Sequence, residues 1–263
     1  MAARKKARRA AKRRTLKASP AVRKAAAKSA KRAARGAPFR KLAAGTGDKP
    51  KSGPGRPVLH GLFLSVPSCK VGLGLAMMGI AFDYHHVDLR AGAHKTPDFA
   101  AKNRFQQVPV LEHDGHFICQ SNAILQHLAD SYGKLGGRSK AEKLRVAEWL
   151  SWEQDRMVSV GLTRFFTRFE QRAADDPVLA WARTRAEAAL GMLDRQLGQT
   201  KFLAGAEPTI ADIAAFAWAA VANEGGLDVA RWPNVQAWAE RLMKLPGASH
   251  PYDAMPKEDR VAA

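Results

Sequence analysis

The chain contains 263 residues, of which 46% are hydrophobic and 8% aromatic, so it is long enough to build two modest domains. It has no run of roughly 18 or more apolar residues, and its two cysteines, Cys69 and Cys119, form no Cys-x-x-Cys pair. These features argue against a membrane span, a disulfide framework and a cysteine zinc site, and they predict a cytoplasmic protein that uses no metal.

The net charge of +19 is concentrated at the start of the chain. Residues 1–51 contain 19 Lys and Arg but only one acid, Asp48, which gives +18 and leaves +1 for residues 52–263. Residues 1–57 are also low in complexity and end in a Gly/Pro-rich stretch. This composition predicts a disordered basic tail followed by a linker.

Three interpretations of this tail stay open. Residues 1–51 could bind DNA or RNA without sequence preference, by releasing counterions from the phosphates. The segment could instead direct the chain to an organelle, since it is basic and free of acids up to Asp48. It could also be a dispensable or mis-started extension, because the patterns described below are complete without it.

The part of the sequence that begins at Val58 first shows the pattern of a small α/β domain. Its elements follow the order βαβ-ββα, and Asp114-Gly115 predicts a hairpin between the last two strands. The expected strands and helices cover residues 58–64, 70–78, 82–89, 108–111, 116–119 and 121–132, with a loop over 91–97. We therefore expect one domain over residues 58–134.

Everything after Lys134 shows helical periodicity. Thr209 and Asp212 form a capping box at the start of one of these helices, and Pro233 suits the first position of another. The expected helices cover residues 140–169, 178–197, 209–221 and 233–245. The pattern predicts an all-helical domain over residues 139–250, followed by a C-terminal tail over 251–263.

Two junctions between a strand and a helix carry candidate anion-binding groups. Ser65 stands where the first strand meets a helix, and Ser121 leads a helix directly after Gln120. The free N–H groups and the dipole of a helix N-terminus favour a negative charge. The alternative is that Ser65 or Ser68, and likewise Ser121, only caps its helix.

Two further stretches add polar groups between these junctions. His94 and Lys95 offer cationic donors on a loop, although solvated loop charges are the simpler interpretation. In Gln107-Val108-Pro109, a proline enters a strand, where it removes one ladder donor. If the bond before Pro109 is cis, the Val108 backbone faces outward and can pair with an extended peptide.

Together and in this order, the four stretches resemble the cytosolic glutathione S-transferases, particularly the theta and phi classes and their bacterial relatives, over residues 58–247. The segments Phe202–Ile213 and Pro233–Gly247 are similar to that family's C-terminal capping box and last helix. The resemblance implies a thioredoxin-like glutathione-binding domain followed by an all-helical bundle.

The resemblance also implies a role for each matching residue. Ser65 would bind the glutathione sulfur, and His94 and Lys95 would hold the glycine carboxylate. Gln107 and Val108 would line the peptide beside a cis Pro109. Gln120 and Ser121 would hold the γ-glutamyl end.

Three departures from the family pattern predict weaker glutathione binding. Gln106 stands where glycine is usual, and its bulk could crowd the loop before Val108. Gln120 replaces the commoner glutamate. Gly72 and Gly74 are expected to loosen the helix that follows Ser65.

The resemblance implies an enzyme, a glutathione transferase in which the thiolate attacks a small electrophile, and a homodimer with a role in detoxification. Glutathione would be the co-substrate. A glutathione-dependent thiol-disulfide reductase or peroxidase, and a non-catalytic module held on nucleic acid by its tail, are the alternatives.

Cys69 is a competing nucleophile, but four residues past Ser65 its sulfur is expected to point away from the ligand. Cys119 is expected in the core. Candidates for the electrophile pocket are aromatic and basic residues of the long helix: Trp149, Trp152, Arg156, Phe165 and Phe166.

Overall fold

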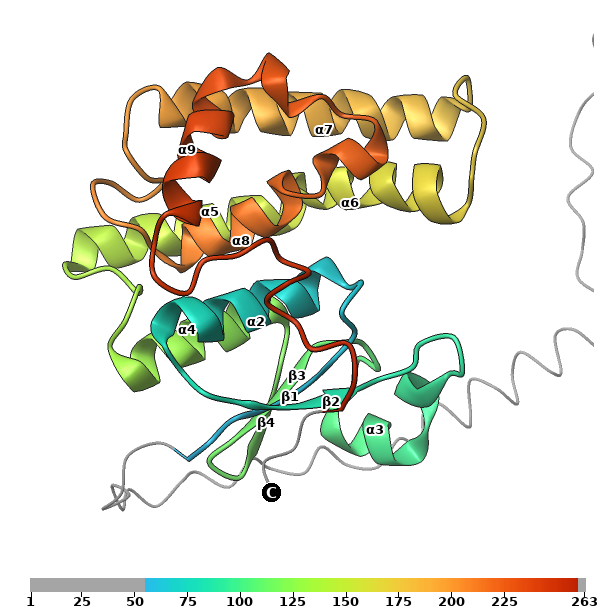
Figure 1. Cartoon of the computed structure of the whole chain (residues 1–263), viewed down its shortest axis with the longest axis vertical. Helices are drawn as coiled ribbons and strands as arrows, with labels where there is room; N and C mark the ends of the chain where they lie inside the picture. The colour runs from blue at the N-terminus through green and yellow to red at the C-terminus, as the bar shows by residue number, and fades with distance from the viewer. Residues whose placement is uncertain (1–54, 260–263) are drawn as a thin grey trace, which may run out of the picture. The chain divides into compact units, whose positions relative to one another are not determined.

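The computed structural model describes residues 55–259 (Figure 1). The predicted disordered tail and linker therefore lie outside the described residues, apart from Gly55, Arg56 and Pro57. So do the last four residues of the chain.

The first half of the described chain contains a four-stranded sheet with helices on it. The elements are β1 (Val58–Gly61), α2 (Val66–Met78), β2 (Asp83–His86), the 3₁₀ turn η1 (Ala93–Lys95), α3 (Pro97–Lys102), β3 (Val110–His113), β4 (His116–Cys119) and α4 (Ser121–Tyr132). The predicted loop over 91–97 is thus wrong in part, because η1 and the first residue of α3 lie inside it. Thr96 caps α3 by accepting a hydrogen bond from the Phe99 N–H, and Pro97 suits the first helical position.

The strand order is β2-β1-β3-β4. β1 pairs in parallel with β2 through the crossover helix α2, and the other neighbours are antiparallel. Asp114 and Gly115 join β3 to β4 with φ angles of 49° and 75°, which is the left-handed backbone that a tight hairpin turn needs. This topology brings the C-terminal end of β1 and the start of α4 to the same region of the domain.

The second half is helical. Its elements are α5 (Lys140–Arg156), α6 (Val158–Arg164), the π-helical turn η2 (Phe165–Phe169), α7 (Pro177–Leu197), α8 (Ile210–Ala219), the 3₁₀ turns η3 (Ala222–Gly225) and η4 (Val229–Arg231), and α9 (Pro233–Met243). The prediction of one helix over 140–169 is wrong. The helix is interrupted at the buried Met157, and α6 begins at Val158. Residues from Val158 to Gly161 are weak helix formers, which favours an interruption here.

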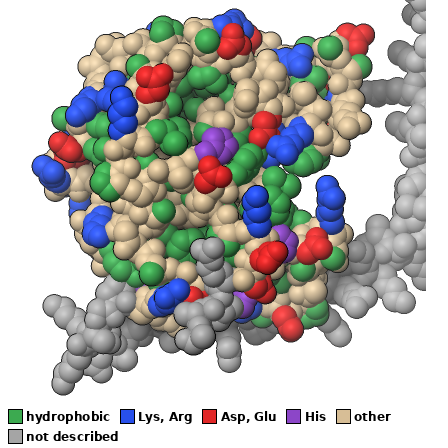
Figure 2. All heavy atoms as spheres, viewed as in Figure 1, with side chains coloured by type: hydrophobic (Ala, Val, Ile, Leu, Met, Phe, Trp, Pro, Cys, Tyr) green, Lys and Arg blue, Asp and Glu red, His purple; other side chains and the backbone are tan. Residues whose placement is uncertain are grey.

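α2 and α4 lie between the sheet and the helical half, and α2 packs against both α4 and α8 (Figure 1). Leu59, Tyr84 and Leu111 from the sheet join Leu190, Ile213 and Trp238 from the helices in one continuous core. On the face seen in Figure 2, Lys and Arg alternate with Asp and Glu rather than gathering in one patch.

The glycines of α2 allow close packing. A Cβ at Gly74 would lie 2.4 Å from Leu125 Cδ2 of α4. A Cβ at Gly72 would lie 2.6 Å from Met255 Sδ. The expectation that Gly72 and Gly74 loosen this helix missed these contacts, because helix propensity contains no information about distant neighbours.

The segment after α9 returns from the helices to the sheet (Figure 1). Gly247, with φ of 73°, lies directly against the backbone of Ala76 in α2, where a Cβ would approach the carbonyl oxygen to 2.1 Å. Met255 is buried beside Gly72, and Asp259 Oδ1 accepts a hydrogen bond from the His86 N–H at 2.6 Å. The residues up to Asp259 therefore fasten the helical half to α2 and β2.

Candidate functional site

A cavity of about 450 Å³ lies between the first turns of α2 and α4, the loop before β3, and the helical half. All eight residues that the sequence assigned to a ligand line it. The lining residues are Ser65, Pro67, Leu89, His94, Lys95, Asn103, Gln106, Gln107, Val108, Pro109, Gln120, Ser121, Gln154, Val158 and Trp218.

Ser65 occupies the N-cap position of α2, after a turn in which its N–H donates to the Leu62 carbonyl at 2.9 Å. Among the described residues, no N–H of α2 donates to its side chain. Ser68 instead is fully buried and accepts from the Leu62 N–H at 3.3 Å. The Ser65 hydroxyl is thus left to face the cavity at the positive end of a helix.

Gln120 and Ser121 form the second helix start in the cavity wall. Gln120 has φ of 71° and ψ of 116°, an uncommon conformation for a residue with a side chain, and it lies at the N-cap of α4. No side chain in the described part of the protein caps this helix. Ser121, the first residue of α4, is buried and lines the cavity.

The loop before β3 supplies the third wall. The Val108–Pro109 bond is cis, as the sequence interpretation required. Asn103 is buried and holds the loop, because its Nδ2 donates to the Gln107 carbonyl at 2.6 Å. Asn103 was not assigned a role from sequence, although an amide just after a helix and before a tight loop could have suggested one.

Gln106 adopts φ of 52° in this loop. The left-handed region suits glycine, which explains why glycine is usual at this position in the pattern that the sequence resembles. Glutamine in place of glycine at position 106 therefore adds backbone strain as well as side-chain bulk.

His94 and Lys95 lie on η1. Lys95 is exposed to solvent at the cavity, whereas His94 is half-buried. The Nδ1 atom of His94 is buried and lacks a hydrogen-bond partner among the described residues.

The helical half contributes Gln154, Val158 and Trp218 to the cavity. Sequence reasoning missed all three. Of the aromatic and basic residues it suggested, Trp149 and Trp152 pack against the core in an edge-to-face pair, and the cavity wall includes none of the five. A capping box followed by an apolar helix ending in tryptophan was the only available signal for Trp218.

The two cysteines lie outside this cavity wall. Cys69 is fully buried, and its Sγ lies 3.0 Å from the Phe63 carbonyl, to which the thiol donates. Burial raises the pKa of the Cys69 thiol to about 12. A thiol that stays protonated is a poor nucleophile, so this geometry does not support the competing role for Cys69. Cys119 is only half-buried, and burial also raises its pKa.

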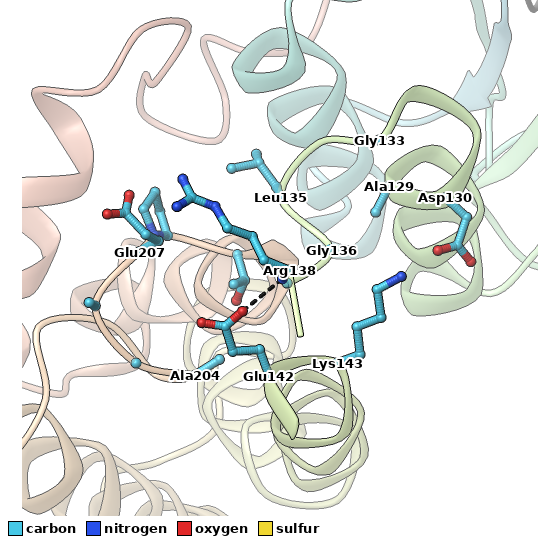
Figure 3. Close-up of a pocket in the computed structure, with 15 residues that line it drawn as sticks. Ala129, Asp130, Gly133, Leu135, Gly136, Arg138, Glu142, Lys143, Ala204 and Glu207 are labelled. Carbon is cyan, nitrogen blue, oxygen red and sulfur yellow. Dashed lines mark hydrogen bonds between the residues drawn. The ribbon is translucent and has the colours of Figure 1, made fainter. Parts of the chain in front are cut away.

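A second cavity of about 380 Å³ lies at the junction between α4, α5 and the loop before α8 (Figure 3). It contains none of the predicted site residues. Its charged side chains include Glu142, whose carboxylate caps α5 by accepting from the N–H groups of Arg138 and Ser139 at 2.8 and 3.0 Å. We interpret this cavity as a gap left where these elements pack together, and not as the functional site.

Within residues 55–259, no cluster of three or more His, Cys, Asp or Glu side chains is arranged to hold a metal ion. In the same range, every helix is too short or too polar to cross a membrane.

Comparison with protein families matches residues 59–130 to the model "Glutathione S-transferase, N-terminal domain" and residues 154–246 to "Glutathione S-transferase, C-terminal domain". The chain is 30% identical over 212 residues to Glutathione S-transferase 3 of Zea mays, covering 75% of this chain and 94% of the relative. It is 29% identical over 187 residues to the Disulfide-bond oxidoreductase YghU of Escherichia coli, covering 66% and 64%.

Among solved structures, a glutathione S-transferase from Pseudomonas fluorescens matches with a TM-score of 0.71 and 31% identity, over 75% of this chain and 99% of that one. A glutathione transferase family member from the same organism, solved with two glutathione bound, matches with a TM-score of 0.66 over 73% and 90% of the chains. At 24% identity, the second likeness shows the fold alone.

Proposed function

The chain belongs to the glutathione S-transferase family, and on that premise we propose that it is a glutathione transferase in which Ser65 stabilises the thiolate of bound glutathione. The observation that carries the proposal is the single cavity lined by all eight residues from four separate stretches of sequence. Glutathione is the co-substrate, and a small electrophile is the second substrate.

The Ser65 hydroxyl is free of the capping role and stands at a helix N-terminus. A free thiol with a pKa of about 8.5 is mostly protonated at neutral pH, and lowering that pKa by about two units requires roughly 2.7 kcal/mol. One hydrogen bond to a charged acceptor contributes roughly 1.5–3 kcal/mol, and the helix dipole adds roughly 0.3–1 kcal/mol. One serine at this position is therefore sufficient, without a general base.

The two ends of the tripeptide need different partners. At the glycine end, Lys95 supplies a positive charge for the carboxylate, and the His94 ring lies beside it in the cavity wall. At the γ-glutamyl end, the Ser121 hydroxyl and the N–H groups in the first turn of α4 donate to the other carboxylate, with Gln120 beside it. The Val108 backbone, beside the cis Pro109, pairs with the cysteinyl unit between them.

The electrophile is bound against the helical half, where Val158 and Trp218 offer apolar surface and Gln154 a polar group. A cytoplasmic detoxifying homodimer is the physiological form that we propose by analogy with the family.

Reduction of disulfides by glutathione is the second candidate. It is favoured by the similarity to the Escherichia coli oxidoreductase, although the chain spans only 64% of that relative. Since the Cys69 thiol is buried with a raised pKa, both thiols of such a reaction would come from glutathione.

The test is the variant Ser65→Ala, with Ser68→Ala as the matched control in the same helix. We expect Ser65→Ala to raise the pKa of bound glutathione and to lower kcat/KM by roughly 10- to 150-fold, the equivalent of one charge-assisted hydrogen bond. Ser68→Ala removes only the bond to the Leu62 N–H and should lower stability while leaving the thiol pKa in place. An unchanged thiol pKa in Ser65→Ala would refute the assignment.

Conjugation of glutathione to an aryl halide separates the two candidate reactions. Turnover of the halide supports the transferase. Binding of glutathione without conjugation, together with reduction of a small disulfide, supports the reductase instead.

A further inference from the structure

A buried ion pair lies behind the proposed glutathione site. Lys70 of α2 and Glu153 of α5 are 0% and 2% exposed in their side chains, and Nζ lies 2.8 Å from Oε1. Desolvation lowers the pKa of Lys70, while the Glu153 carboxylate opposes that shift. Neither side chain lines the cavity, and the site's chemistry described above does not use them.

Two more helices join this pair. Asn122 of α4 accepts from Lys70 Nζ at 3.1 Å and donates through Nδ2 to Glu153 Oε2 at 2.7 Å. Trp218 of α8 donates its indole N–H to Glu153 Oε1. The carboxylate therefore receives hydrogen bonds from three helices besides its own, and its acceptor capacity is well used.

Each helix in this network also carries a residue of the cavity wall. Asn122 directly follows Ser121, Glu153 directly precedes Gln154, and Trp218 itself lines the cavity. Lys70 lies five residues after Ser65 on α2. The network thus joins, at one carboxylate, four of the helices that contribute to the cavity wall.

Trp218 makes two further contacts. Lys70 Nζ lies over its ring, 5.8 Å from the ring centroid. The ring also lies close to Gly161 of α6, where a Cβ would lie 2.5 Å from the Cζ3 atom. The bonded N–H and these two contacts hold the indole in the cavity wall.

A buried ion pair is weak evidence for stability, because the cost of removing two charges from water offsets most of their attraction. Apolar residues of similar volume would fill the same space with little loss. A fully bonded buried network instead fixes the relative positions of the elements that it joins.

We propose that the Lys70–Glu153 pair is a positioning unit for glutathione: it sets the placement of the helix starts at Ser65 and Ser121 and of the Trp218 wall. The inference rests on the proposed function, because the ligand that it positions is glutathione. Both residues act through the cavity wall, and the ligand touches neither.

The test uses the double variant Lys70→Met/Glu153→Gln in the full-length protein. This variant removes both charges, keeps the volume similar, and leaves an amide that can still bond with Asn122 and Trp218. The probe is S-methylglutathione, which binds without thiol chemistry, and its Kd is measured by titration calorimetry alongside Tm. KM values are measured separately for glutathione and for the aryl halide.

We expect the double variant to keep a Tm within a few degrees of the wild type. We expect its Kd for S-methylglutathione and its KM for glutathione to rise on the order of tenfold, while KM for the halide changes less. A double variant that folds and binds S-methylglutathione like the wild type would overturn the proposal.

Asp212→Asn is the matched control, because Asp212 is another buried carboxylate that accepts from an indole N–H, that of Trp238 at 2.9 Å, but lies away from the cavity. It should lower Tm without changing Kd for the probe. An equal rise in Kd in this control would show general loosening of the fold and would also overturn the proposal.

Asn122→Leu keeps the ion pair and removes the side-chain hydrogen bonds of α4 to Lys70, to Glu153 and to the Leu150 carbonyl, so it tests the proposal if the double variant does not fold. We expect its Kd for the probe to rise several-fold, and an unchanged Kd contradicts the inference. If the wild type itself does not bind S-methylglutathione, the proposed function fails, which is a separate result.

Discussion

The two halves of the described chain serve the cavity in different ways. The sheet half, up to α4, supplies the polar groups proposed to hold glutathione, and they lie at element starts and in loops. The helical half supplies only Gln154, Val158 and Trp218 to the wall, and its buried polar side chains, such as Glu153 and Asp212, bond inside the core. Local backbone geometry therefore determines the first set, and packing between distant helices determines the second.

A similar contrast in exposure exists between one hydroxyl group and one thiol group near the start of α2. Ser65 lines the cavity, whereas Cys69, one helical turn later, is fully buried. One turn of helix decides which of the two can take part in chemistry.

The largest effect expected from this contrast concerns Cys69. Its pKa of about 12 exceeds the ordinary value of 9.0 by three units, so at pH 8 we expect a thiol reagent to modify it about a thousandfold more slowly in the folded than in the unfolded protein. Reaction with an aromatic disulfide reagent, with and without denaturant and with Cys69→Ala as reference, measures this. Rapid modification of Cys69 in the native protein would contradict the burial.

The same shift fixes a pH dependence. Between about pH 9 and 12 the unfolded thiol is ionised while the folded thiol keeps its proton, so the folded state binds more protons and stability falls as pH rises through this window. Cys69→Ala should make the decline less steep.

An intermediate effect is expected at Asp212 in the helical half. Its carboxylate accepts from the N–H groups of Leu203, Thr209 and Trp238, each at 2.9 Å, and it is fully buried. Asp212→Asn replaces an acceptor oxygen by a donor, and we expect the free energy of unfolding to fall by about 3 kcal/mol. Urea denaturation measures the loss. A change below about 1 kcal/mol would show that the network does not hold the helical half together.

The smallest effect is expected at Gln106 in the sheet half. Because φ is 52° there, Gln106→Gly should relieve strain and raise the free energy of unfolding by about 1 kcal/mol. Gln107→Gly is the control, since Gln107 has no positive φ and should gain nothing from the change. We also expect Gln106→Gly to lower the KM for glutathione modestly. An increase in this KM would contradict the idea that the Gln106 side chain crowds the loop before Val108.

Sequence reasoning succeeded where the signal is local. The helix from Ser121 to Tyr132 was predicted with the bounds observed, and the order of strands and helices in the sheet half was right apart from α3. The predicted ligand residues meet in one cavity because each belongs to a motif of a few residues. Their individual roles stay predictions until the variants above are measured.

Sequence reasoning failed where packing between residues far apart in the chain determines the structure. Trp149 and Trp152 have the spacing of a pocket wall or of a core face, and only the position of the neighbouring helices makes them core. Gly72 and Gly74 are weak helix formers in isolation, yet they admit Met255 and Leu125. Trp218 and Glu153 are separated by 65 positions in the chain, and no short motif links them.

The segment after α9 has a practical consequence for anyone who edits this protein. Gly247 and Met255 contact α2, the helix that begins directly after Ser65, so the segment from Gly247 to Met255 helps to hold this helix in place. Shortening the chain after Met243 would remove the contacts of Gly247 with Ala76 and of Met255 with Gly72, and we expect this to weaken the proposed glutathione binding although it removes none of the proposed ligand contacts. Affinity tags and fusions at this end therefore need a spacer beyond Asp259.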